Sequence, residues 1–167
     1  MDDEINTEST TTKVNETTAE TATTKANVTP TQTTTDTATT SATPSDLPDA
    51  VPADLKDVAA LNSFATNLYI KYVKPNIFTA PASLFSVAEK DDARKALALV
   101  IDAETKAIAM YDKNEAFYFL RGKAYEQSFY DTKDAAFKEK GLVDLQKALD
   151  MGLAMAKTNF DALTAAK

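Results

Sequence analysis

The sequence contains no histidine and no cysteine, and its only glycines are Gly122, Gly141 and Gly152. Without histidine, the chain lacks the commonest general base and metal ligand of proteins. Without cysteine, it has no disulfide, no thiolate metal site and no thiol nucleophile. The three glycines are too far apart to form a phosphate-binding loop. We therefore expect a protein that is not an enzyme and that binds no metal and no cofactor.

Long apolar runs and basic clusters are also missing. No stretch of about 18 apolar residues occurs, so the sequence predicts no membrane-spanning helix. The net charge is -7, and the only arginines are Arg94 and Arg121. Because lysine and arginine supply most of the non-specific affinity for nucleic acids, this balance argues against a nucleic-acid partner.

The first 48 residues contain no aromatic residue, and 18 of them are threonine. Such a segment cannot bury enough apolar surface to offset the entropy lost when its backbone is ordered. It also carries most of the net charge, with eight acidic residues against Lys13 and Lys25. We therefore predict a disordered, Thr-rich, low-complexity tail over residues 1–48 and one folded domain over residues 49–167.

The composition of this tail suits a plain spacer. It also suits a glycosylated stalk, because threonine and serine tracts with proline accept O-linked sugars, and Asn15 and Asn27 fit the N-glycosylation pattern. The acidic residues after Met1 are the reverse of the basic start of a signal peptide. Because folded cytosolic domains seldom need such a long spacer, we expect that a native leader has been removed. On this interpretation the protein is secreted or is an envelope-anchored lipoprotein, whose tail holds a soluble domain away from the membrane.

Apolar residues recur three and four positions apart through the domain, which is typical of amphipathic helices. We expect five helices, at about 52–74, from 86 or 92 to 110, 115–128, from 132 or 134 to 150, and 154–165. The loop after Pro75 contains Ile77 and Phe78, which we expect to pack onto the core. No alternation of β-branched residues indicates a strand, so the predicted fold class is all-α.

A repeated pattern appears within these helices. The similar segments 106–110 and 147–151 lie about 41 residues apart. Between them, the sequence EAFYFLRGKAYEQ has Tyr118, Gly122 and Tyr125 at the spacing of the tetratricopeptide repeat, and Gly141 and Leu145 fit the second half of that repeat. The chain therefore resembles the tetratricopeptide repeat family, over about one repeat and a half. A period near 41 also suits a generic stack of helical hairpins.

The resemblance implies antiparallel helical hairpins that present a concave face to a protein or peptide partner. It places four residues of the 115–128 helix on that face: Phe119, Lys123, Glu126 and Gln127. An exposed Phe119 flanked by charges would suit a peptide groove. The competing interpretation is that Phe119 packs beneath the first or the last helix as part of the core.

These observations lead to two functional hypotheses. The first is a protein–protein interaction or adaptor module without catalysis. The second is a small helical carrier that binds an apolar ligand between its helices. An open groove would favour the first hypothesis, and a closed apolar cavity above about 300 Å³ would favour the second.

Overall fold

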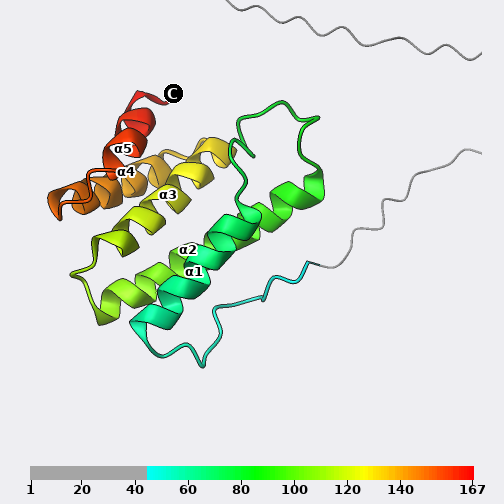
Figure 1. Ribbon diagram of the computed structural model, residues 1–167. Coiled ribbons are helices and arrows are strands. Elements are labelled where there is room, and N and C mark those ends of the chain that lie inside the picture. Colours follow the sequence, from blue (N-terminus) through cyan, green and yellow to red (C-terminus); the bar gives the residue numbers. More distant parts are fainter. Residues whose placement is uncertain (1–44) are drawn as a thin grey trace, which may run out of the picture. The chain divides into compact units, whose positions relative to one another are not determined.

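The computed structural model of the protein describes residues 45–167, which form five helices and no strand (Figure 1). The helices are α1 (Val58–Tyr72), α2 (Val87–Met110), α3 (Glu115–Thr132), α4 (Ala135–Asp150) and α5 (Ala156–Ala165). The predicted all-α class is therefore confirmed for this part of the chain. Residues 1–44 of the predicted tail lie outside the described residues.

Side-chain caps explain where several helices begin. The Asp57 side chain accepts a hydrogen bond from the backbone N–H of Ala60 at 2.8 Å, and α1 starts directly after it. Ser86 and Glu89 form a reciprocal capping box at the start of α2. A capping box satisfies two backbone N–H groups that have no partner inside the helix. It therefore decides between the two predicted starts of this helix in favour of Ser86.

We expect Ser86→Ala to lower the free energy of unfolding by about 1 kcal/mol, because the substitution removes the hydroxyl that caps α2. Urea unfolding followed by circular dichroism would measure this change. Ser63→Ala is a suitable control, since Ser63 is exposed inside α1, where alanine is the better helix former. An equal loss in both variants would contradict the role given to the cap.

Two helices differ from their predicted bounds for reasons that lie in tertiary packing. The first helix begins at Val58 rather than near 52, because the preceding segment crosses the core with Leu47 and Val51 buried. The third helix continues four residues beyond its predicted end. It stops at Lys133, whose backbone adopts a left-handed conformation with φ of 60°.

The helices pack as successive antiparallel hairpins, with α3 in contact with each of the other four (Figure 1). One hydrophobic cluster joins α1 and α2 to α3, where it includes Phe117 and Ala124, and a second joins α3 to α4 and α5, where Tyr118, Phe119 and Phe129 take part. Ile77 is fully buried and Phe78 packs against the first cluster, as expected from the sequence. The helices α2 and α4 both pack on α3 but do not contact each other.

The contact between α3 and α4 depends on two glycines. A Cβ atom on Gly122 would lie 2.9 Å from Leu145 Cγ and 3.2 Å from the Leu145 backbone nitrogen. A Cβ atom on Gly141 would lie 3.4 Å from the Gly122 carbonyl oxygen. The two helix backbones therefore approach each other where neither has a side chain, which is the packing reason expected for a glycine inside a helix. None of the described helices has the length and apolar character needed to cross a bilayer.

Candidate functional site

Two of the four predicted site residues line an opening where α1, α3 and α5 meet. Lys123 and Gln127 border a hollow of about 240 Å³. The end of α1 and the loop after it contribute Tyr69 and Asn76 to its wall, and α5 contributes Asn159. Three separate segments of the sequence therefore converge on the predicted face, and we call this opening the α1–α3–α5 hollow.

Lys123 lies between two aromatic rings beside this hollow. Its ammonium nitrogen is 4.9 Å from the centre of the Tyr69 ring and 5.4 Å from the centre of the Phe119 ring. At such distances the negative face of a ring attracts a cation. The Phe119 side chain is partly buried and packs against the second hydrophobic cluster. Phe119 is therefore mainly a packing residue that supports Lys123, and the structure favours its core interpretation over an open contact.

Glu126 does not lie on an open face as expected, since it is only 4% exposed. Its Oε2 atom accepts a hydrogen bond from Asn159 Nδ2 at 2.8 Å, so α5 covers it. Burial raises the pKa of the Glu126 carboxyl, and the hydrogen bond from Asn159 and the charge of Lys123 partly oppose this shift. Glu126 therefore holds Asn159 at the edge of the hollow and is not available to a partner.

A second and larger opening was not predicted from the sequence. It consists of a hollow of about 460 Å³ between α2 and α4, with α3 as its floor, and an adjoining hollow of about 400 Å³ between α3 and α4. Tyr125 and Lys140 line both hollows. We call the two hollows together the α2–α4 groove.

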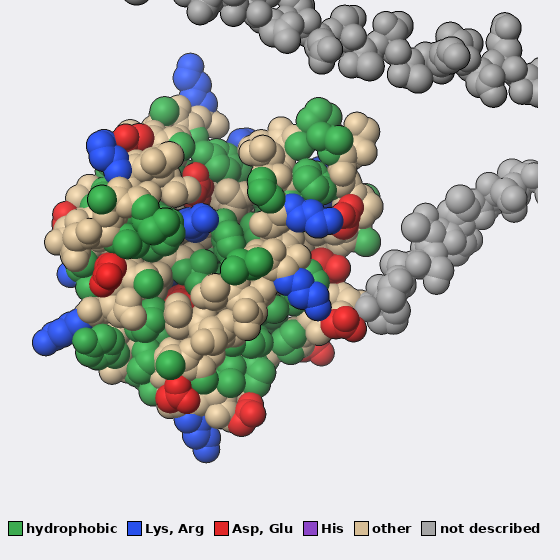
Figure 2. All heavy atoms as spheres, in the orientation of Figure 1, with side chains coloured by type: hydrophobic (Ala, Val, Ile, Leu, Met, Phe, Trp, Pro, Cys, Tyr) green, Lys and Arg blue, Asp and Glu red, His purple; other side chains and the backbone are tan. Residues whose placement is uncertain are grey.

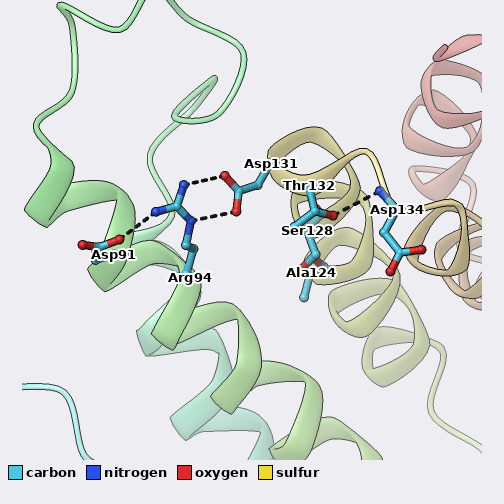
Figure 3. Close-up of polar contacts among 7 residues, drawn as sticks. All are labelled: Asp91, Arg94, Ala124, Ser128, Asp131, Thr132 and Asp134. Atoms are coloured by element: carbon cyan, nitrogen blue, oxygen red, sulfur yellow. Dashed lines mark hydrogen bonds and ion pairs between the residues drawn. The ribbon is translucent and has the colours of Figure 1, made fainter.

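Ion pairs join α3 to α2 and α3 to α4 beside this groove. The Arg94 guanidinium on α2 donates to both carboxylate oxygens of Asp131 at the end of α3, each at 2.8 Å, and also donates to Asp91 (Figure 3). Further along, Arg121 on α3 donates to both carboxylate oxygens of Asp144 on α4, at 2.7 and 2.8 Å. Both arginines of the chain therefore join neighbouring helices.

One buried carboxyl group lacks any hydrogen-bond partner. Glu104 on α2 is fully buried, and neither of its side-chain oxygens is hydrogen-bonded within the described part of the chain. Burial raises the pKa of Glu104 to about 8, although the positive charge of Arg121 partly opposes the shift. The group is therefore mostly protonated and uncharged at neutral pH.

The face of the domain drawn in Figure 2 carries no dominant charge. On the face drawn in Figure 2, lysine, arginine and acidic side chains are interspersed among hydrophobic ones. The fold defines an all-α protein built from antiparallel helical hairpins. Comparisons with protein-family models, with curated proteins and with solved structures gave no match to this chain.

Proposed function

We propose that this domain is a protein–protein interaction module that binds an extended peptide segment of another protein in the α1–α3–α5 hollow. The observation that carries the proposal is a set of hydrogen-bond donors that make no hydrogen bond within the described part of the chain. Lys123, Gln127 and Asn76 line one hollow, and their side-chain nitrogens make no hydrogen bond within residues 45–167. Three residues with donor groups, from two segments, thus border a space that protein atoms leave empty.

A peptide backbone matches these donors. An extended chain offers a carbonyl acceptor at each residue, and those of alternate residues point to the same side. The rings of Tyr69 and Phe119 hold the Lys123 ammonium group in place before binding. The buried contact between Glu126 and Asn159 likewise fixes the α5 wall. A preformed site of this kind loses little side-chain entropy when the partner binds.

We expect peptides selected from a random library on the full chain to bind the double variant Lys123→Ala, Gln127→Ala at least about tenfold more weakly than the original protein. A tenfold loss corresponds to about 1.4 kcal/mol, which suits the loss of two hydrogen bonds. Isothermal titration calorimetry with the enriched peptides measures this change. Unlike Phe119→Ala, the double variant leaves the hydrophobic cluster intact.

A matched control is the double variant Lys113→Ala, Gln146→Ala, whose side chains are exposed and lie outside the α1–α3–α5 hollow. It should bind the same peptides with unchanged affinity. The proposal fails if the library yields no enriched peptide. It also fails if the site variant and the control variant bind the selected peptides with equal affinity. The secreted or envelope location expected from the Thr-rich tail stays a prediction, and fractionation of cells that express the full-length protein would test it.

A further inference from the structure

We propose that the α2–α4 groove is a second binding site, for an aliphatic monocarboxylate with an extended hydrocarbon chain. The site lies on the opposite side of α3 from the α1–α3–α5 hollow. Tyr125 and Ser128 in the groove are roughly half a helix turn away from Lys123 and Gln127, since successive residues turn by about 100°. The inference therefore does not depend on the proposed peptide site.

The larger hollow of the groove has an apolar wall of suitable size. Leu97, Ala98 and Ile101 of α2 form one side, and Phe137 of α4 forms the other. Its volume of about 460 Å³ falls within the range of small-molecule sites, which is about 300–1,000 Å³. Because no Cα atoms of α2 and α4 approach each other within 8 Å, the hollow between these helices leaves room for a chain-like molecule.

Most polar groups in this wall already have partners inside the protein. The Arg94 and Asp131 side chains neutralise each other (Figure 3). The Ser128 hydroxyl donates to the Ala124 carbonyl oxygen at 2.9 Å, and the Thr132 hydroxyl donates to the Ser128 carbonyl oxygen at 2.9 Å. These four side chains therefore offer little to a ligand, and the wall acts as a mainly apolar surface.

Two polar groups at the centre of the groove remain free to bind. Within residues 45–167, the Lys140 ammonium group has no acidic partner and the Tyr125 hydroxyl makes no hydrogen bond. Lys140 lies over the Tyr125 ring, 5.8 Å from its centre, so the two groups are neighbours. One cation and one hydroxyl donor match one carboxylate.

The position of the single unpaired acid near the groove sets the direction of the ligand. Glu139 lines only the smaller hollow, whereas Lys140 and Tyr125 border both. Repulsion by Glu139 disfavours a carboxylate that lies deep in the smaller hollow. The carboxylate is therefore placed at Lys140 and Tyr125, with the hydrocarbon chain in the larger hollow against Leu97 and Phe137.

The experiment is a titration of the isotope-labelled full chain with dodecanoate below its micelle concentration, followed by amide chemical shifts. Saturating shifts are expected for residues 94–101, Tyr125 and residues 137–140. Dodecyltrimethylammonium, which has the same chain and a positive head group, should bind at least about tenfold more weakly, because Lys140 then repels the head group. Equal binding of the two molecules would refute the carboxylate assignment.

Two variants locate the site. Lys140→Met should weaken dodecanoate binding at least about tenfold and remove the preference for the negative head group, whereas Lys113→Met should change neither. Ala98→Trp should abolish binding, because Ala98 is an exposed wall residue whose enlargement fills the hollow. Ala59→Trp, at an exposed position on α1 outside the groove, is its control.

Absence of binding overturns the inference, and so does binding that Lys140→Met and Ala98→Trp leave unchanged. Shifts confined to Leu142, Gln146 and Phe160 would also overturn it, since they would indicate adsorption on the exposed surface between α4 and α5. Selected peptides that displace dodecanoate would assign the groove to a protein partner instead. Because the peptide test relies on Lys123 and Gln127, failure at one site leaves the result at the other unaffected.

Discussion

Glu104→Gln is expected to stabilise the domain by about 3 kcal/mol at pH 7. Glu104 is fully buried without a hydrogen-bond partner, and its pKa is raised from 4.5 to about 8. In the unfolded chain the same carboxyl is ionised and hydrated at pH 7, so folding must first protonate it. Each unit between its unfolded pKa and the working pH costs about 1.4 kcal/mol. Glutamine has nearly the same shape and avoids this cost.

The sign of the pH dependence follows from the raised pKa. Between about pH 4.5 and pH 8, the folded state holds a proton on Glu104 that the unfolded state has lost. The free energy of unfolding of the original protein therefore falls as the pH rises through this window. The advantage of Glu104→Gln over the original protein should grow by about 1.4 kcal/mol per pH unit there and level off near pH 8.

Urea unfolding of both proteins at several values from pH 5 to pH 8.5 measures this difference in the free energy of unfolding. Because the two free energies are subtracted at each pH, the contributions of groups that titrate equally in both proteins cancel. Glu139→Gln, at an exposed position on α4, is the control and should show no such trend. Glu104→Met is a second test, because it removes the unpaired polar atoms altogether. A destabilised Glu104→Gln variant at pH 7, or a difference independent of pH, would contradict the assignment of an uncharged Glu104.

Gly122→Leu is expected to lower the free energy of unfolding by about 3 kcal/mol, at the upper end of the range for overpacked cores. Even the first added carbon would lie 2.9 Å from Leu145 Cγ and 3.2 Å from the Leu145 backbone nitrogen. A side chain can rotate away, but the backbone atom moves only if α4 moves. The substitution must therefore separate α3 from α4 and disturb the second hydrophobic cluster.

Thermal unfolding of Gly122→Leu, Gly122→Ala and Ala109→Leu would test this account. Ala109 is exposed on α2, so its replacement by leucine should leave the melting temperature nearly unchanged. Gly122→Ala should be destabilised less than Gly122→Leu, because alanine adds only one carbon atom and favours the helix. An unchanged melting temperature for Gly122→Leu would show that the close contact between α3 and α4 does not contribute to stability.

The helices could be predicted from the sequence because apolar residues recur three and four positions apart through the domain. Their ends were less predictable where tertiary contacts decide them. The end of α3 at Lys133 has no glycine to mark its left-handed backbone. The late start of α1 depends on the burial of Leu47 and Val51 beneath Lys95, whose ammonium group donates to the Leu47 carbonyl oxygen. Neither feature has a local pattern in the sequence.

The candidate site was predictable only in part. Lys123 and Gln127 line one hollow because they lie four residues apart on α3, which helix geometry alone dictates. Glu126 is buried beneath α5, where it contacts Asn159, which is 33 residues away in the sequence. The pattern of residues within α3 does not show where α5 packs, so this burial could not be predicted. The α2–α4 groove depends likewise on the pair Arg94 and Asp131, 37 residues apart.

The most direct test of the proposed function is a map of where a selected peptide binds. Amide chemical shifts of the isotope-labelled full chain should change on peptide addition at residues 69–76, at 123–127 and at Asn159, which together surround the α1–α3–α5 hollow. The shifts should saturate with the affinity measured by calorimetry. Shifts confined to the α2–α4 groove or to the outer surface of α4 and α5 would contradict the proposal that this hollow receives a protein partner.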